Sequence, residues 1–198
     1  MIRPKIRVER LQGDALARAL PDVARLRIEV FRDWPYLYDG DMAYEEAYLQ
    51  VYRDTDDAIL VAAFDGDDLV GASTGAPMVD HAEDFGAAFG REHPQLDAIF
   101  YCAESVLLPA YRGQGIGHRF FDLREDQARA LGLSHAAFCA VTRPEDHPLR
   151  PATYRPLDPF WRKRGYAPLP GVVAEFGWKD LDRSGETLHP LQFWMRSL

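Results

Sequence analysis

The stretch from Ile99 to Gly132 constrains the fold of this chain more than any other part of the sequence. Its first residues, Ile99 to Leu108, are apolar and β-prone apart from Glu104 and a neighbouring serine, and they predict a buried strand. Pro109 then removes a backbone donor and ends the strand. Glycines follow in a short turn, and apolar residues at helical spacing come directly after them. We therefore expect a strand, a glycine turn and a helix in immediate succession.

The turn from Arg112 to Gly117 reads Arg-Gly-Gln-Gly-Ile-Gly and predicts a phosphate-binding site. Glycines allow the backbone to curl with its N–H groups exposed, and a helix N-terminus attracts anions. Two known phosphate-binding motifs do not fit. No Lys-Ser or Lys-Thr follows Gly117, and the glycine spacing is not that of the dinucleotide fingerprint. An ordinary glycine turn that leads into a helix is the alternative interpretation.

The same residues resemble the R/Q-x-x-G-x-G/A signature of the GNAT acetyltransferase superfamily, here Arg112-Gly113-Gln114-Gly115-Ile116-Gly117. The aromatic segment from Phe160 to Tyr166 is similar to a helix of that family, and Met195 to Leu198 to its last strand. The Pro-Tyr-Leu-Tyr-Asp-Gly sequence of Pro35 to Gly40 resembles one subgroup of the family. The resemblance covers nearly the whole chain, although only the glycine motif is specific.

Length and composition fit this interpretation. The 198 residues, 47% of them apolar, suit a single domain over residues 1–198 with a substantial core. The net charge of −8 argues against a nucleic-acid partner. Two cysteines and no signal peptide or long apolar run predict a cytoplasmic protein that does not associate with a membrane. The histidines lack metal-ligand spacing, so we expect no metal site.

The resemblance implies an α/β (α+β) fold of the GNAT type, in which helices flank a mixed central sheet of about seven strands. Besides the central strand, strands are expected at Lys5–Arg10, Ala58–Phe64, Leu69–Ala76, Ser134–Val141, Val172–Trp178 and Leu191–Arg196. Helices are expected from Asp14 with an interruption at Pro21, over Met42–Tyr52, after the glycine turn, and from a cap at Asp158. A short helical insertion is expected over His81–Leu96.

The resemblance also implies that acetyl-coenzyme A is the co-substrate. The backbone of the strand before the turn would pair with the pantetheine arm, at Val106, Leu107 and Leu108. The pyrophosphate would rest on the turn, at Arg112, Gly113, Gln114, Gly115, Ile116, Gly117 and His118. An exposed helix histidine without a ligand is the alternative for His118.

Transfer of an acetyl group to an amine requires a base, because only the neutral amine attacks. Glu104 is the ionisable residue within the apolar strand, and burial would favour its protonated form. The alternative is that Glu104 pairs with an arginine or a backbone amide. The family often has a tyrosine as general acid where this chain has Trp161, so Tyr154 and Tyr166 are the candidates for that role.

The loop after the first helix predicts the acceptor site. Its aromatic and acidic residues suit a cationic amine; they are Trp34, Tyr36, Tyr38, Asp39 and Asp41. The alternative is that the aromatics seal the domain and the aspartates form turns. We expect a small-molecule amine or a peptide amino group as acceptor, and a homodimer is compatible with the sequence. A coenzyme A-binding sensor or interaction module without turnover is the second functional interpretation.

Overall fold

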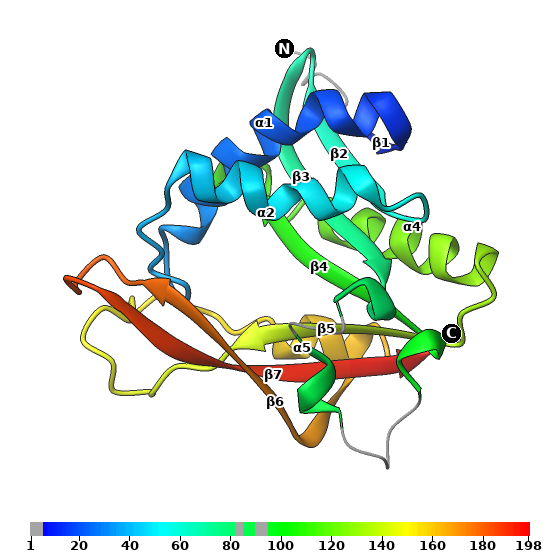
Figure 1. The fold of residues 1–198 in the computed structure, drawn as a ribbon. Coiled ribbons are helices and arrows are strands. Elements are labelled where there is room, and N and C mark those ends of the chain that lie inside the picture. Colours follow the sequence, from blue (N-terminus) through cyan, green and yellow to red (C-terminus); the bar gives the residue numbers. More distant parts are fainter. Residues whose placement is uncertain (1–5, 82–84, 90–94) are drawn as a thin grey trace.

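The computed structural model describes residues 6–81, 85–89 and 95–198, and a seven-stranded sheet forms its centre (Figure 1). Its strands are β1 (Arg7–Leu11), β2 (Ile59–Asp65), β3 (Asp68–Pro77), β4 (Ile99–Leu107), β5 (His135–Val141), β6 (Ala167–Lys179) and β7 (Glu186–Ser197). They lie in the order β1-β2-β3-β4-β5-β7-β6, and β4 and β5 run parallel while the other neighbours run antiparallel. The predicted mixed sheet flanked by helices is therefore confirmed.

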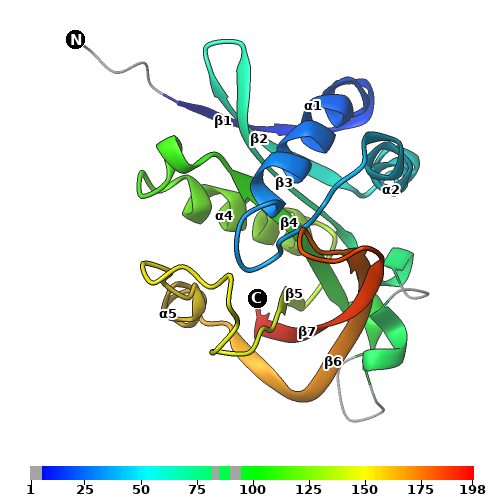
Figure 2. The ribbon, with the colours of Figure 1, turned by 90° about the vertical axis from the view of Figure 1, so that its left-hand side faces the viewer.

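Helices cover both faces of the sheet (Figure 2). Helices α1 (Gly13–Phe31) and α2 (Met42–Asp54) pack on one face, and α4 (Ile116–Ala130) packs on the other together with the short α5 (Asp158–Lys163). Strand β2 is apolar from Ile59 to Phe64, and its first five residues are buried because both faces of the sheet are covered there. Ile59 belongs to the cluster beneath α4, whereas Leu60 packs beneath α1 and α2. Within the described residues, no helix is long and apolar enough to cross a membrane.

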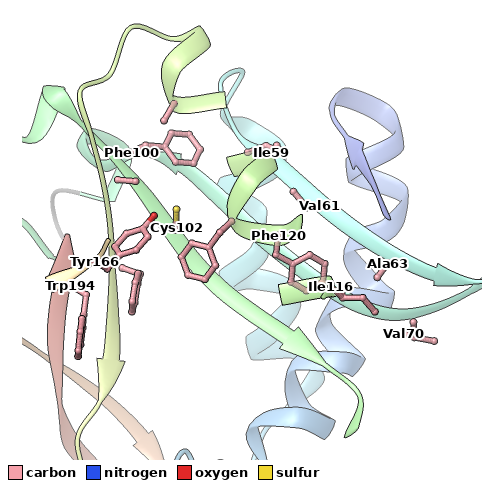
Figure 3. Packing of buried hydrophobic residues seen from close by; sticks show 14 residues of the cluster. Ile59, Val61, Ala63, Val70, Phe100, Cys102, Ile116, Phe120, Tyr166 and Trp194 are labelled. Atoms are coloured by element: carbon pink, nitrogen blue, oxygen red, sulfur yellow. The ribbon is translucent and has the colours of Figure 1, made fainter. Parts of the chain in front are cut away.

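The core beneath α4 fixes the start of that helix (Figure 3). Ile116, its first residue, and Phe120, one turn later, are both buried against the sheet. The glycine turn that precedes them is consequently held at the end of β4 by apolar packing. Gly132 follows the helix with φ 74°, the left-handed conformation that is common for a glycine just after a helix.

Three details of the predicted helices are wrong. Helix α1 runs through Pro21 without interruption. Leu20 and Val23 on either side of Pro21 are buried, so packing against the sheet maintains the helix where a hydrogen bond is lost. Asp14 lies in the first turn of α1 and not at its cap, which is Gln12. Asp158 likewise is the first residue of α5 and not its cap, which is Leu157.

The predicted helical insertion at His81–Leu96 consists of short 3₁₀ helices where it is described. These are η1 (Met78–His81), η2 (Gly86–Ala88) and η3 (Leu96–Ala98), and a fourth, η4 (Pro109–Tyr111), precedes the glycine turn. Residues 82–84 and 90–94 of the prediction lie outside the described residues, as does Lys5 of the first strand.

Strands β4 and β5 separate after a short parallel pairing, and this separation positions the site. They pair only from Ile99 to Tyr101 on the β4 side, and beyond that point they diverge (Figure 1). Strand β4 also carries a bulge, because Ser73 of β3 pairs with Ser105 while Gly75 pairs with Cys102. The β4 residues after the bulge therefore have a strand partner on one side only.

The loop between α1 and α2 reaches across the molecule to the end of β6 (Figures 1 and 2). Tyr38 forms an isolated bridge with Asp180, and the N–H of Asp39 donates to the carbonyl of Lys179 at 2.9 Å. The N–H of Leu181 donates to the carbonyl of Leu37 at 2.8 Å. Segments from opposite ends of the chain thus join beside the divergence of β4 and β5.

Candidate active site

A large cleft of about 980 Å³ lies where β4 and β5 diverge. Strand β4 contributes Glu104 and Leu107 to its wall, and the glycine turn contributes Gly113, Gly115 and Gly117. Strand β5, the segment that leads into α5, and the first residues of the loop after α1 line the rest. The cleft therefore joins the predicted phosphate-binding turn to the predicted base.

The glycine turn presents free backbone donors to this cleft. Gly113 and Gly115 have φ values of 75° and 82°, a left-handed conformation that glycine adopts without strain. In the part of the chain that the structure describes, the N–H groups of residues 113–117 donate to no protein acceptor. Donors that converge at the start of α4 suit a phosphate group.

Two residues predicted for this turn do not have free N–H groups, because each donates to a carbonyl of the protein. The N–H of Arg112 donates to the carbonyl of Pro109 at 3.2 Å, and the N–H of His118 donates to that of Gly115 at 3.1 Å. The exposed guanidinium of Arg112 and the His118 ring still border the cleft. The side chain of Ile116 is buried in the core, so only its N–H can face a ligand.

Along β4 the backbone alternates between β3 and the cleft. The N–H of Leu108 donates to the carbonyl of Val70 in β3 at 3.0 Å, so the polar groups of Val106 also point toward β3. Those of Leu107 point the other way, and the Leu107 carbonyl accepts a bond of 3.1 Å from Nε of Arg112. Of the three residues predicted to pair with pantetheine, the geometry favours Leu107 and not Val106 or Leu108.

Glu104 lies in the β4 bulge and is 6% exposed. Nη1 of Arg27 donates to its Oε2 at 2.8 Å, so the predicted alternative of an arginine partner describes an actual contact. Arg124 supports the bulge from α4, because its Nη1 donates to the carbonyls of Glu104 and Thr74, each at 3.2 Å. The carboxylate thus has a fixed position in an ion pair with Arg27.

Arg27 serves a second buried carboxylate, that of Glu45 in α2. Glu45 is 0% exposed, and its Oε2 accepts a bond from Nε of Arg27. Burial would lower the pKa of Arg27, but Glu104, the nearby Tyr48 hydroxyl and Glu45 together raise it well above its usual value. One guanidinium therefore pairs with two carboxylates. The remaining oxygens, Oε1 of Glu45 and Oε1 of Glu104, are buried and accept no hydrogen bond within the described structure.

A small chamber of about 100 Å³ lies next to the large cleft and contains this charge cluster. Arg27, Glu45 and Glu104 are its charged residues, and aromatic rings form most of the rest. The chamber and the cleft share Phe31, Tyr36, Ala103, Glu104 and Cys139 as lining residues. Glu104 consequently faces both spaces.

The three aromatic residues predicted for the acceptor site line these spaces. Trp34 lines the cleft, Tyr38 the chamber, and Tyr36 both. Arg143 holds this loop, since its guanidinium donates to the carbonyls of Pro35 at 2.8 Å and Tyr36 at 2.6 Å. The same guanidinium forms a bidentate pair with Asp180, at 2.7 and 2.8 Å.

The two aspartates predicted to bind the acceptor do not line either space, and that prediction is corrected. Asp39 pairs with Lys179 at 2.7 Å, and the hydrogen bond from Lys179 lowers the pKa of Asp39. Asp41 caps α2, where its carboxylate accepts from the N–H of Tyr44 at 3.0 Å. Both act in the local structure of the loop, as the alternative interpretation of turn-forming aspartates expects.

The structure separates the two tyrosines predicted as general acids. Tyr154 lines the cleft beside Trp34, and burial raises its pKa, so its hydroxyl keeps its proton at neutral pH. Tyr166 is 2% exposed within the core, and its hydroxyl donates to Glu125 at 3.0 Å (Figure 3). Tyr166 lines neither space, so the prediction of a catalytic role for it is corrected. Trp161 does line the cleft.

Cys139 lies between the two spaces, with its Sγ 3.4 Å from the Tyr101 hydroxyl. Burial raises the pKa of this thiol to about 12, so the nucleophilic thiolate is scarce at neutral pH. This favours direct transfer over an acyl-cysteine route. Among the described residues, no three histidine, cysteine or acidic side chains gather to hold a metal ion.

Sequence reasoning missed Arg27 and Glu45, which share the charge cluster with Glu104. A signal for both was present. Arg27 falls four residues after Val23 on the buried stripe of α1, and Glu45 falls four residues before Leu49 on that of α2. A charged residue within an apolar stripe is costly to bury without a partner. Two such residues on successive helices therefore predict a buried ion pair.

Comparison with protein families gives a match over residues 23–152 to the family described as Acetyltransferase (GNAT) family. The chain belongs to the GNAT acetyltransferase family. The matched residues include the glycine turn, Glu104 and most of the acceptor loop. No curated protein matches the chain.

Solved acetyltransferase structures share the fold over nearly the whole chain. A proposed acetyltransferase from Acinetobacter baylyi is 12% identical, with a TM-score of 0.63 over 98% of this chain and 93% of its own. A ribosomal-protein-alanine N-acetyltransferase from Brucella melitensis is 14% identical, with a TM-score of 0.61 and coverage of 98% and 99%. A Salmonella typhimurium protein with its cofactor acetyl-CoA is 11% identical, with a TM-score of 0.59 and coverage of 98% and 94%.

Proposed function

We propose that this GNAT protein transfers the acetyl group of acetyl-coenzyme A directly to a primary amine. One observation carries the proposal: the three glycines of the turn, whose amides donate to no protein acceptor, and the buried Glu104 line the same cleft. The first feature suits an anionic donor and the second suits the proton chemistry of an amine. The assignment to a subgroup through Pro35–Gly40 and the cytoplasmic location stay predictions.

The residues of the cleft fit coenzyme A. The free amides of the glycine turn and the Arg112 guanidinium would hold its pyrophosphate, and the cleft-facing backbone of Leu107 would pair with its pantetheine arm. When bound, acetyl-coenzyme A supplies an acetyl group activated as a thioester. The volume of about 980 Å³ leaves room for an extended ligand beside β4.

Glu104 is the group that we assign to take the proton of the ammonium. It pairs with Arg27 through Oε2, and its Oε1 is buried without a donor. An ammonium placed at that oxygen would supply the missing donor and lose a proton to it. Because Glu45 shares Arg27, the charge cluster can accept a proton and still hold one carboxylate against the guanidinium.

Tyr154 is the remaining candidate for the proton that the leaving thiolate needs, because it lines the cleft with a protonated hydroxyl. In the overall change an N–C bond forms and the C–S bond of the thioester breaks. The ammonium loses two protons, of which the thiolate gains one and solvent receives the other through Glu104. No oxidant or reductant is involved.

The test is a thiol-release assay with acetyl-coenzyme A over a panel of amines, amino acids and peptides. We expect thiol release that depends on the amine and a matching acetylated product by mass spectrometry. Tight coenzyme binding without release for any amine would favour the second interpretation, a sensor or interaction module. Absence of coenzyme binding would contradict the proposal outright.

A further inference from the structure

The small chamber has an uncompensated negative charge. Among its lining residues, Glu45 and Glu104 are the carboxylates and Arg27 is the guanidinium, so their formal charges sum to −1. Burial raises the pKa of Tyr36, Tyr38, Tyr48 and Tyr101, so the hydroxyls of these four lining residues do not change this sum. A buried site of this charge is completed by one cation.

Each of the two carboxylates has one oxygen that could accept a hydrogen bond from such a cation. Oε1 of Glu45 and Oε1 of Glu104 are both buried and accept no hydrogen bond of normal geometry within the described structure, although the Tyr38 hydroxyl lies close to the Glu45 carboxylate. Leaving a buried charged acceptor unpaired is costly, so each oxygen marks a position where a donor would be stabilised. In the present geometry Arg27 bonds to Oε2 of each carboxylate and supplies no donor to either Oε1.

The walls of the chamber suit an organic cation and not a hydrated metal ion. Aromatic rings surround the carboxylates; they include Tyr36, Tyr38, Tyr48, Tyr101, Phe176 and Trp178. Rings of this kind attract an ammonium through their faces and accept an apolar body. Arg27 itself shows this preference, as its guanidinium lies 4.5 Å from the Tyr48 ring centroid and 5.1 Å from that of Phe31.

We propose that the chamber is the acceptor site and that it selects a small primary amine with an apolar body and no carboxylate of its own. This inference rests on the proposed function, because Glu104 faces both the chamber and the cleft. An amino acid with a free α-carboxylate would bring a third negative charge beside Glu45 and Glu104 and is rejected. The volume of about 100 Å³ excludes a folded polypeptide.

The test uses isoamylamine and phenethylamine as probes. Each has a carboxylated counterpart, leucine or phenylalanine, and a neutral counterpart, isoamyl alcohol or 2-phenylethanol. Binding is measured by calorimetry on the protein saturated with coenzyme A, which carries no acetyl group, and again on the protein alone. We expect at least one amine to bind tenfold or more tightly than both of its counterparts.

The Glu45→Gln variant tests whether the charge of the chamber causes the tighter binding of the amine. It removes one charge but keeps the Arg27–Glu104 pair, and we expect the amine affinity to fall about tenfold toward that of the neutral counterpart. Glu46→Gln, on the exposed side of the same helix, is the matched control and should bind the amine as the unchanged protein does. Thermal melting and coenzyme binding verify that both variants fold.

Equal binding of an amine and its amino acid would overturn the inference, as would equal losses in the two variants. Thiol release to carboxylated acceptors, combined with no binding of the simple amines, would also refute the inference while leaving acetyl transfer intact. Failure of coenzyme A to bind would instead refute the proposed function, and the measurements on the protein alone would still decide the inference.

Discussion

At the scale of single residues, the ratio of one guanidinium to two carboxylates decides how the site responds to substitution. Arg27 donates to Glu45 and to Glu104, and all three side chains are buried. Loss of Arg27 would leave two uncompensated charges, so Arg27→Met should destabilise the fold by about 3–5 kcal/mol or more. Urea unfolding of the variant beside the unchanged protein measures this loss. Loss of one carboxylate instead leaves a balanced pair, so substitutions of the glutamates are the informative ones for function.

Glu104→Gln should lower kcat by roughly 10²–10⁴-fold, because the amide cannot take the proton of the ammonium. Coenzyme affinity should change little, since Arg27 and Glu45 remain paired. Steady-state kinetics with the best amine and calorimetry with coenzyme A measure the two effects. Unchanged turnover in a folded variant would mean that Glu104 only maintains the structure and that water or Glu45 accepts the proton.

At the scale of elements, the turn between β4 and α4 combines strict backbone geometry with tolerance in its side chains. A Cβ at Gly117 would approach only the Phe160 ring, at an ordinary distance of 3.6 Å. Gly117 does not have a positive φ either. A variant with a larger residue there should therefore fold. The substitution should affect the binding of the ligand that the free amides would hold.

Gly117→Val should weaken the binding of acetyl-coenzyme A by at least tenfold, because the added methyl groups obstruct approach to the turn amides. Gly185→Val is the control, since a Cβ at Gly185 meets nothing within 4 Å and the residue lies outside the cleft. Calorimetry on both variants decides the matter. Equal affinities would remove the phosphate-binding role of the turn.

At the scale of the whole molecule, contacts between distant segments form the acceptor side. Arg143 joins the loop after α1 to Asp180 at the end of β6 through four hydrogen bonds. We expect Arg143→Lys to raise the KM for the amine about tenfold, because a single ammonium cannot reproduce the planar guanidinium contacts. The KM for acetyl-coenzyme A should not change.

Arg129→Lys is the matched control for this prediction, since Arg129 is 46% exposed on the outer side of α4. Kinetics against each substrate separately give the comparison. A rise in both KM values, or no rise in either, would contradict the assignment of Arg143 to positioning the acceptor loop. Urea unfolding of both variants accounts for any loss of stability.

The sequence predicts the donor side of the site better than the acceptor side. Glycine spacing, the strand before it and the apolar helix after it are local patterns, and the turn from Arg112 to Gly117 follows from them. The partners of the acceptor loop are not local. Whether Asp39 would face a ligand or Lys179 depends on where β6 ends, and whether Tyr166 would reach the cleft depends on Glu125 in α4. The spacing of apolar residues also does not predict that α1 continues past Pro21, because packing against the sheet maintains the helix there.

The coenzyme-binding turn and the acceptor chamber therefore differ in how far apart in the sequence their residues lie. The turn that would hold the coenzyme is formed by consecutive residues between β4 and α4, although the core beneath α4 also includes Tyr166 and Trp194. The chamber needs Arg27, placed early in the sequence, together with Trp178 and Leu191 near its other end. Closing so long a loop is entropically unfavourable until the last strands pair. The acceptor chamber is thus the half of the site that depends on contacts between residues far apart in the sequence, whereas the turn is a local unit of the chain.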